Sequence, residues 1–325
     1  MTILSDRYAR QITLPEIGAD GQAKLTNSKI LVVGAGGLGA PVLAYLAGAG
    51  VGHIMIIDHD IVSASNLHRQ TLFTESQIGQ SKADLAAIFC CNLNKDIDVV
   101  AINQRLTPLN AVDLVAAADI VLDCADSFAA SYILSDICRD TATAFISASA
   151  LGMAGYVGGF CDTAPSLRAV FPDLPQNLAS CSTAGVLGPV IGVLGSMQAQ
   201  MALAIALGLS PSPLGQLIRY DAGNMRSSHF RFDNAPEPET AYGFVDASEI
   251  RDDDFVVDLR DKNEAPVPVT PNALRFDVAN ITTQFPIDTA HRRVVLCCRS
   301  GLRAWQAAHI IHPKWHGEIT LVAAN

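Results

Sequence analysis

Positive charges are scarce in this sequence and are nowhere grouped. Lysine and arginine together number 22, against 32 aspartates and glutamates, which gives a formal net charge of -10. Proteins that bind nucleic acids neutralise phosphates with clustered lysines and arginines, and no such cluster occurs here. The composition therefore argues against a nucleic-acid partner. Half of the residues are hydrophobic, which suffices for a large buried core.

Cysteine pairs with metal-binding spacing are also missing. None of the eight cysteines forms a C-x-x-C pair, so we expect no zinc site built from four cysteines. Two adjacent pairs, Cys90 with Cys91 and Cys297 with Cys298, lie in apolar stretches. That placement is typical of a reduced cytoplasmic protein and argues against a disulfide framework.

Signals for export or membrane insertion are absent or weak. The N-terminal stretch is charged from Asp6 onward and has no apolar core, so we expect no secretory signal and a cytoplasmic location. One apolar run, residues 186–209, is long enough to span a bilayer. Gln198 and Gln200 lie near its middle, and no lysine or arginine flanks it closely. A buried helix is the better interpretation, and we expect no membrane partner.

Short apolar runs rich in β-branched residues alternate with helical segments over the first half of the chain. Such runs are typical of strands in a parallel sheet whose two faces are covered by helices. The expected strands lie at 30–34, 53–58, 98–103, 118–124 and 143–148. The expected helices include 40–49, 82–93 and 127–139. This alternation predicts a doubly wound, Rossmann-like α/β fold.

The pattern changes after residue 155. Further strands are expected at 156–162 and 217–222, as parts of a mixed sheet. Residues 234–241 are rich in proline and glutamate and are expected to form a linker. Three more strand-like runs follow, at 255–260, 293–298 and 318–323. We therefore predict one domain over residues 1–233 and a second, small α/β domain over residues 242–325.

A glycine-rich turn follows the first expected strand. Gly34, Gly36 and Gly39 match G-x-G-x-x-G, with Gly37 between them, and the turn leads directly into a helix. Glycines there let the backbone approach phosphates at a helix N-terminus. Asp58, at the end of the next strand, is placed to hold ribose hydroxyls. The turn alone does not distinguish NAD from ATP, and a turn that only packs helix on strand is the alternative.

Several further motifs occur in a fixed order along the first domain. They are Arg7-Tyr8-x-Arg10-Gln11, Asp58-His59-Asp60-Ile61-Val62, Ser65-Asn66-Leu67-x-Arg69-Gln70, Gly79-Gln80-Ser81-Lys82, Asp123-Cys124-Ala125-Asp126 and Thr183-Ala184-Gly185-Val186. Together they resemble the MoeB, ThiF and HesA family, the bacterial relatives of ubiquitin-activating enzymes. The resemblance extends from about Ser5 to Phe232 and is far more specific than the glycine turn.

The resemblance implies an ATP site. Because a triphosphate carries more negative charge than a dinucleotide pyrophosphate, several cations must converge on it, and Arg10, Arg69 and Lys82 are the candidates. In the family, the residue that matches Arg10 reaches the site from the other subunit, which implies a homodimer. Asn66 would contact the phosphates or the ribose, and Asp126 would hold Mg²⁺. Taken singly, Arg69 or Lys82 could be a solvated surface charge and Asp126 a helix N-cap.

The reaction implied by this family is adenylation of a carboxylate. The substrate would be the C-terminal Gly-Gly of a ubiquitin-like sulfur carrier similar to ThiS or MoaD, whose carboxylate attacks the α-phosphate of ATP and releases pyrophosphate. The protein would contribute positioning and electrostatics to this step. The acyl-adenylate could then receive sulfur, with a cysteine desulfurase as its source. The product would be the thiocarboxylate needed for thiamine or molybdopterin biosynthesis.

The sequence departs from the family in two places. Many members carry two C-x-x-C pairs that bind structural zinc, but the corresponding segments here, residues 162–168 and 232–239, contain no cysteine. We therefore expect no zinc. Ser127 stands where the family usually has asparagine after the aspartate, although the carboxylate of Asp126 itself is retained.

Two cysteines have features of sulfur chemistry. Cys181 precedes the long apolar helix, whose N-terminus could stabilise a thiolate, and the matching cysteine in ThiF-like proteins links covalently to the carrier. A passive loop cysteine is the alternative. Cys298 opens the segment Cys298-Arg299-Ser300-Gly301-Leu302-Arg303, which resembles a rhodanese active-site loop, a nest of backbone N–H groups closed by an arginine that can hold a persulfide. Residues 256–261 and Glu264 resemble the early rhodanese strand, although the segment is short for that family. A buried strand cysteine is the alternative for Cys298.

Two other functions stay open from the sequence. An NAD-dependent oxidoreductase is supported by the glycine turn alone, since no acid–base pair for hydride transfer is recognisable. A non-catalytic scaffold that binds a carrier protein is disfavoured by the presence of Arg10, Arg69, Lys82 and Asp126. The identity of the carrier also stays open, because the segment around Thr183 favours a ThiF-like protein and the rhodanese-like domain favours a MoeB-like one.

Overall fold

The large sheet contains the predicted nucleotide-binding motifs. The computed structural model describes residues 4–172, 185–285 and 292–324, and over this part of the chain the sheet has eight strands in the order β3-β2-β1-β4-β5-β6-β7-β8. Their bounds are β1 (Lys29–Val33), β2 (His53–Ile57), β3 (Asp98–Ile102), β4 (Ile120–Asp123), β5 (Ala144–Leu151), β6 (Ala154–Phe160), β7 (Gln216–Asp221) and β8 (Arg226–Arg231). The strands from β1 to β5 are parallel, whereas β6, β7 and β8 are added antiparallel. The predicted mixed, Rossmann-like α/β fold is confirmed.

Helices cover both faces of this sheet. On one face α4 (Gly39–Ala49), α5 (Lys82–Leu93) and α10 (Gly188–Leu207) share an apolar core with the strands. On the other face α6 (Pro108–Ala116) and α7 (Phe128–Asp140) belong to a second core. Because strand side chains alternate, Ile30 and Val32 enter the first core while Leu31 and Val33 enter the second. This explains why β1 is a continuous apolar run.

Shorter elements complete the first part of the chain. They are α1 (Leu4–Arg7), α2 (Ala9–Ile12), α3 (Gly18–Asn27), α8 (Leu167–Val170) and the 3₁₀ turns η1 (Ala64–Asn66) and η2 (Glu75–Gln77). The sequence patterns did not single out α3, α6 or β8.

The long apolar helix α10 lies in the core, as expected. By length and composition it could cross a membrane. However, it packs against α4, β5 and β6, and half of the residues in its apolar stretch are buried. Gln198, near its middle, is fully buried, and its Nε2 donates a hydrogen bond to the Asp123 carbonyl oxygen at 2.8 Å. The polar residue that argued against a membrane span therefore ties α10 to the end of β4.

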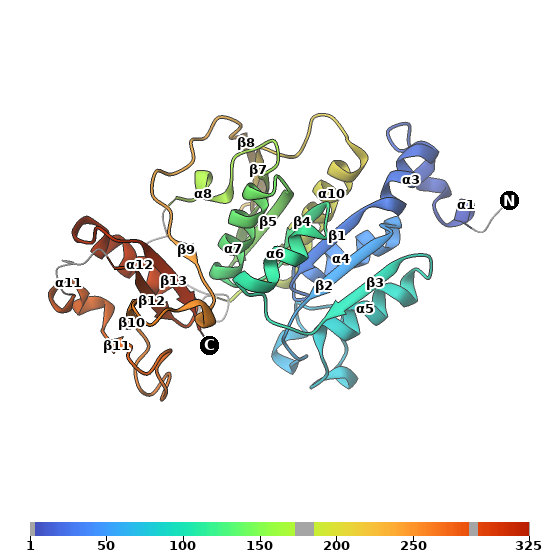
Figure 1. The fold of residues 1–325 in the computed structure, drawn as a ribbon. Coiled ribbons are helices and arrows are strands. Elements are labelled where there is room, and N and C mark those ends of the chain that lie inside the picture. The colour runs from blue at the N-terminus through green and yellow to red at the C-terminus, as the bar shows by residue number, and fades with distance from the viewer. Residues whose placement is uncertain (1–3, 173–184, 286–291, 325) are drawn as a thin grey trace.

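A second sheet follows from Gly243 onward. Its described strands are all parallel and lie in the order β11-β10-β12-β13-β9. The elements of this unit are β9 (Gly243–Phe244), η3 (Ala247–Glu249), β10 (Phe255–Asp258), β11 (Leu274–Arg275), η4 (Val278–Asn280), α11 (Ile281–Gln284), β12 (Val294–Cys298), α12 (Leu302–Ile311), η5 (His312–Lys314) and β13 (Ile319–Ala323). Figure 1 shows this orange-to-red unit beside α7. Trp305 of α12 makes the contact, with its ring 5.4 Å from that of Phe128 and 5.1 Å from that of Tyr132.

The order of the strands reverses between β1 and β4. From β1 the chain proceeds to β2 and β3 on one side, and it then returns to build β4 and β5 on the other. In open α/β sheets, ligands bind outside the carboxyl ends of the strands at such a switch point. Here the carboxyl ends of β1, β2 and β4 are followed by Gly34, Asp58 and Cys124, so the predicted motifs meet at this edge.

Candidate functional site

The glycine turn packs directly against the turn that follows β4. Gly34 has a φ of +96°, and a Cβ atom there would lie 2.8 Å from the carbonyl oxygen of Cys124. A Cβ on Gly39, where α4 begins, would meet the carbonyl of Gly34. Both positions therefore require glycine. The start of α4 consequently lies at the switch point, where the helix dipole would stabilise an anion.

Asp58 shapes the same turn. One of its carboxylate oxygens accepts a hydrogen bond from the backbone N–H of Ala35 at 2.8 Å, and the other accepts from the N–H of Asp60 at 2.8 Å. Burial raises the pKa of Asp58, and these two hydrogen bonds oppose that effect. The carboxylate expected to hold ribose hydroxyls thus also fixes the glycine turn to the end of β2.

Asn66, Arg69 and Lys82 all lie on the segment that joins β2 to α5. Lys82 is only 4% exposed, and its Nζ contacts Asp60 Oδ2 at 2.9 Å. The alternative interpretation of Lys82 as a solvated surface charge is therefore wrong. The guanidinium of Arg69 donates to the carbonyl oxygen of Ser65 at 3.1 Å and lies 2.8 Å from His68 Nε2. Asn66 ends the 3₁₀ turn η1, and its carbonyl oxygen accepts bonds from the N–H groups of Arg69 and Gln70.

Gln70 is a residue that the sequence pattern contained but to which no role was assigned. It is 5% exposed, and its Nε2 lies next to Gly36 of the glycine turn. Its buried Oε1 has no hydrogen-bond partner among the described residues. Since a buried unpaired carbonyl oxygen is costly, Gln70 is a candidate to receive a donor from a bound nucleotide.

Asp126 lies in the turn between β4 and α7. Ser127, not Asp126, caps α7, because the Ser127 hydroxyl accepts a bond from the N–H of Ala130 at 3.4 Å. The alternative interpretation of Asp126 as the helix cap is therefore wrong. The Asp126 side chain is exposed and has no hydrogen bond or ion pair within the described ranges. A carboxylate free at the switch point is available to a cation. Geometrically, the His, Cys, Asp and Glu side chains of the described residues form one group that could hold a metal ion, Asp58 with His59 and Asp60, at this same edge.

Asp123, beneath Asp126, is a second residue without an assigned role. It is completely buried, and its carboxylate accepts bonds from the hydroxyl of Ser147 at 2.9 Å and the N–H of Ala125 at 3.2 Å. Burial raises the pKa of Asp123 to about 6 despite these hydrogen bonds, and the nearby charge of Asp126 acts in the same direction. Its place in the Asp-x-x-Asp motif marks Asp123 in the sequence, but its raised pKa follows from burial, which the motif does not reveal.

Asp123 should make stability depend on pH. Its pKa rises from an ordinary value of 3.8 to about 6 on folding, so between these values the folded state binds the extra proton. The free energy of unfolding should therefore fall as pH rises through this window, by a contribution on the order of 3 kcal/mol. The free energy of unfolding is measured in urea at about pH 4 and about pH 6, and Asp123→Asn should lack this contribution to the difference between them. Asp113→Asn, on the exposed face of α6, should retain the full difference. An unchanged difference in Asp123→Asn would show that Asp123 does not cause the pH dependence.

Arg10 does not reach the site of its own chain. It lies on α2, which is anchored where α4 and α5 end: Gln11 Nε2 donates to the carbonyl of Ala49 at 3.0 Å, and Asn94 Nδ2 donates to the hydroxyl of Tyr8 at 2.7 Å. These anchors lie at the amino edge of the parallel strands, opposite the glycine turn. The Arg10 side chain is exposed there.

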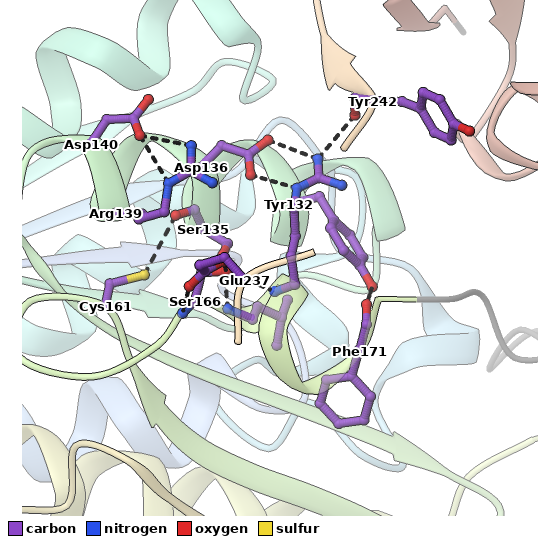
Figure 2. A network of polar contacts seen from close by, with 12 residues as sticks. Tyr132, Ser135, Asp136, Arg139, Asp140, Cys161, Ser166, Phe171, Glu237 and Tyr242 are labelled. Atoms are coloured by element: carbon purple, nitrogen blue, oxygen red, sulfur yellow. Dashed lines mark hydrogen bonds and ion pairs between the residues drawn. The ribbon is translucent and has the colours of Figure 1, made fainter. Parts of the chain in front are cut away.

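The two segments where family members carry zinc-binding cysteines are joined here by side chains. The Glu237 carboxylate accepts bonds from the N–H of Ser166 at 2.7 Å and from its hydroxyl at 2.6 Å, as Figure 2 shows. The Ser166 side chain is buried, and residues 234–241, expected to be a linker, are thereby held on the large sheet. These two hydrogen bonds, called the Glu237–Ser166 clip below, thus connect the two segments that zinc would connect in family members with the cysteines.

Loss of this clip should lower stability modestly. Because Glu237 is exposed, Glu237→Gln should reduce the free energy of unfolding by about 1 kcal/mol, while a metal chelator should leave thermal unfolding of the native chain unchanged. Glu239→Gln, an exposed neighbour, serves as the matched control. A chelator that lowered the unfolding temperature as far as the substitution would show that the clip is not what holds these segments.

Cys298 ends β12 and is completely buried. Its Sγ accepts bonds from the N–H groups of Gly301 at 3.1 Å and Ala304 at 3.4 Å. Arg303 closes the loop by donating to the carbonyl of Leu259 at 2.9 Å and pairing with Glu264. Two N–H groups aimed at one sulfur form a cradle that can stabilise a thiolate or a persulfide. Cys181 lies outside the described residues, so its surroundings are not assigned.

Cys297 differs from its neighbour. It lies on the opposite face of β12, in a small apolar cluster with Val256, Val295 and Val322. Burial raises the pKa of Cys297 to about 12, so its thiol stays protonated and unreactive. Both cysteines are thus buried in β12, and what distinguishes Cys298 is that its Sγ accepts hydrogen bonds from two N–H groups of the loop that follows.

Comparison with known proteins gives the following matches. The model of the ThiF family matches residues 8–241. Adenylyltransferase and sulfurtransferase MOCS3 from Bos taurus is 44% identical over 235 residues, which cover 69% of this chain and 50% of that protein. SAMP-activating enzyme E1 from Haloferax volcanii is 36% identical over 254 residues, which cover 77% of this chain and 93% of that protein. The chain thus spans about half the length of the MOCS3 relatives it matches.

Solved structures show the same fold. E. coli MccB with MccA-N7isoASN superposes with a TM-score of 0.63 at 24% identity, over 71% of this chain and 73% of that one. E. coli MccB with ATP gives a TM-score of 0.62 at 23% identity, over 71% and 72% of the two chains. At this level of identity the likeness concerns the fold alone.

Proposed function

Because this chain belongs to the ThiF family, we propose that it adenylates the C-terminal Gly-Gly carboxylate of a ubiquitin-like sulfur carrier, similar to ThiS or MoaD, at the expense of ATP. The activated carrier would then become a thiocarboxylate for thiamine or molybdopterin biosynthesis in the cytoplasm. The names of two relatives support this proposal, since one is an adenylyltransferase and sulfurtransferase and the other activates SAMP.

One observation carries the proposal. Cys124 lies beside both Gly34 and Gly39, since a Cβ atom on either glycine would come within 4 Å of it, so the glycine turn and the turn after β4 form one surface at the switch point. Asp126, two residues further on, presents a free carboxylate on that surface. An anion at the start of α4 and a cation at Asp126 would therefore be neighbours, as the phosphates of ATP and their counter-ion require.

The adenylation step needs positioning and charge more than covalent chemistry. A carrier carboxylate oxygen attacks the α-phosphorus, the bond from that phosphorus to the bridging oxygen breaks, and pyrophosphate leaves with the electron pair. Arg69 and Lys82 would stabilise the charge on the leaving group, and for this Lys82 exchanges Asp60 for a phosphate oxygen. Asn66 and Asp58 would hold the nucleotide at its phosphates and ribose.

Asp126 fits a Mg²⁺ ion. Its carboxylate is exposed and unpaired among the described residues, and Mg²⁺ typically binds one or two carboxylates together with substrate phosphates. When bound, the ion would offset negative charge on the pyrophosphate. Arg10, at the opposite edge of its own sheet, would act in the site of a second copy, so the proposal includes a homodimer.

Cys298 would carry the sulfur. The thiolate of Cys298 attacks the outer sulfur of a donor persulfide, such as that of a cysteine desulfurase, and the donor leaves as a thiolate. The Cys298 persulfide then attacks the acyl carbon of the adenylate, AMP leaves, and a second thiol cleaves the resulting acyl disulfide to release the thiocarboxylate. Because Cys298 is buried, the loop from Arg299 to Arg303 must open for both transfers.

The test is ATP–pyrophosphate exchange with purified ThiS-like and MoaD-like carriers in parallel. We expect exchange with one carrier, and none when its terminal glycine is deleted. Exchange that proceeds without any carrier, or ATP binding without exchange for either carrier, would overturn the proposal.

A further inference from the structure

A cavity of about 200 Å³ lies where the two sheets meet. Its walls come from the turn between β3 and α6, from the start of α7, and from β9 and β13 of the second sheet. Residues that line it include Arg105, Thr107, Ser127, Phe244, Asp246 and Ala323. Figure 1 shows β9 and β13 beside α7 at this junction.

Both candidate reaction centres border this cavity. Ser127 is adjacent in sequence to Asp126, the proposed cation ligand. Ala323 is the ladder partner of Cys298 in the pairing of β12 with β13. A Cβ on Gly301 of the Cys298 loop would lie 2.6 Å from the ring of Phe244 and 3.4 Å from Ala129, both of which line the cavity. The carboxyl edges of the two sheets therefore open onto one shared space.

The charge at this junction is positive and uncompensated. Arg105 lines the cavity, and Arg299 follows Cys298 directly. Neither guanidinium has a hydrogen bond or ion pair to any residue that the structure describes. Burial and the nearby Arg299 charge lower the pKa of Arg105, as expected where a counter-anion is missing. Asp246 also lines the cavity, but its Oδ1 accepts bonds from the N–H and the hydroxyl of Ser248.

The size of the cavity limits what it can hold. At about 30 Å³ for each water, 200 Å³ corresponds to roughly seven water molecules. Sites for larger ligands usually measure about 300 to 1,000 Å³, so a nucleotide is too large. The last residues of an extended chain, with no side chains beyond glycine and with a terminal anion, match both the volume and the charge.

We infer that this junction cavity binds the anionic C-terminal end of the carrier's Gly-Gly tail, with Arg105 and Arg299 as its anion-binding residues. The inference rests on the proposed function, which supplies the carrier. It assigns the tail a station between Asp126 and Cys298 within one chain, so the activated tail and the sulfur-bearing loop are brought together without a second copy. Arg105 would thereby help to select carriers that end in a free carboxylate or thiocarboxylate.

Photo-crosslinking of the full chain tests this inference. The probe is a peptide that ends in Gly-Gly with a free carboxylate and carries a benzophenone side chain three residues before its end. We expect crosslinks on residues that line the cavity, such as Leu106, Phe244 and Val245. Their yield should fall about tenfold with the C-terminal amide of the same peptide, and about tenfold in Arg105→Gln and Arg299→Gln.

The controls separate charge from folding and this inference from the proposed function. Arg251→Gln removes the same charge at the opposite edge of the second sheet, before β10, and should crosslink like the native chain. Arg105→Lys should restore much of the yield. Crosslinks that are equally strong in Arg105→Gln, or confined to the glycine turn, would overturn the inference. Because pyrophosphate exchange is measured separately, exchange without cavity crosslinks defeats the inference alone, and cavity crosslinks without exchange defeat the adenylation proposal alone.

Discussion

Replacing Asp126 with asparagine is expected to reduce carrier-dependent ATP–pyrophosphate exchange roughly 100-fold. The substitution keeps the shape of the side chain but removes the charge that would hold Mg²⁺ against the phosphates. Because the Asp126 side chain is exposed and Ser127 caps α7, folding should be unaffected. The loss should therefore appear in the rate at saturating carrier, with an unchanged unfolding temperature.

The matched control for Asp126 is Asp113→Asn. Asp113 is an exposed carboxylate on α6, on the same face of the large sheet and away from the switch point. The Asp113→Asn variant should exchange pyrophosphate at the native rate. If Asp126→Asn retained exchange within about twofold of the native chain, the carboxylate would have no part in the step and the site would be wrongly assigned.

Replacing Arg168 with methionine is expected to destabilise the junction between the two sheets by about 3 kcal/mol or more. Arg168 is 1% exposed and forms two hydrogen bonds to the Asp136 carboxylate, at 2.6 and 2.7 Å. It also donates to the carbonyl oxygen of Tyr242 at 3.0 Å. Its guanidinium lies 4.8 Å from the ring centre of Tyr132 and 4.9 Å from that of Trp305. Methionine would leave Asp136 with a largely buried, unpaired charge.

The measurement is urea unfolding followed by tryptophan fluorescence. The chain has two tryptophans, Trp305 and Trp315, and both lie in the second unit, so the signal reports the part that Arg168 holds. Arg139→Met is the control, because the Arg139–Asp140 pair lies on α7, the helix that carries Asp136, but is exposed, and such pairs contribute about 1 kcal/mol or less. Equal losses in the two variants would refute the role of Arg168 as the clamp between α7 and the second unit.

Most strands of both sheets could be predicted from sequence because each is a short run with a strong local pattern, but β8 and the two-residue strands β9 and β11 were not predicted. The runs that became β1, β2, β4 and β12 are apolar and rich in β-branched residues, and such runs favour strands wherever they pack. Strand β8 was missed because its side chains are exposed throughout, so no apolar pattern marks it. The contact of the second unit with α7 could not be predicted, since it depends on Trp305 and Tyr132, far apart in the chain.

The candidate site was predictable where a motif carries its own geometry. A glycine turn between strand and helix has few conformations, so the places of Gly34, Gly39 and Asp58 follow from their spacing. The roles of Asp123 and Gln70 could not be predicted, because they depend on burial beneath residues from other elements. The same holds for Glu237, whose partner Ser166 lies 71 positions earlier in the chain.

The most direct test of adenylation follows the carboxylate oxygens of the carrier. A carrier whose C-terminal carboxylate is labelled with oxygen-18 is incubated with the protein, ATP, Mg²⁺, a sulfur donor and a thiol, and the products are analysed by mass spectrometry. If the carboxylate attacks the α-phosphorus, AMP must carry one labelled oxygen and pyrophosphate none. Unlabelled AMP, or label in pyrophosphate, would contradict adenylation of the carrier by this protein.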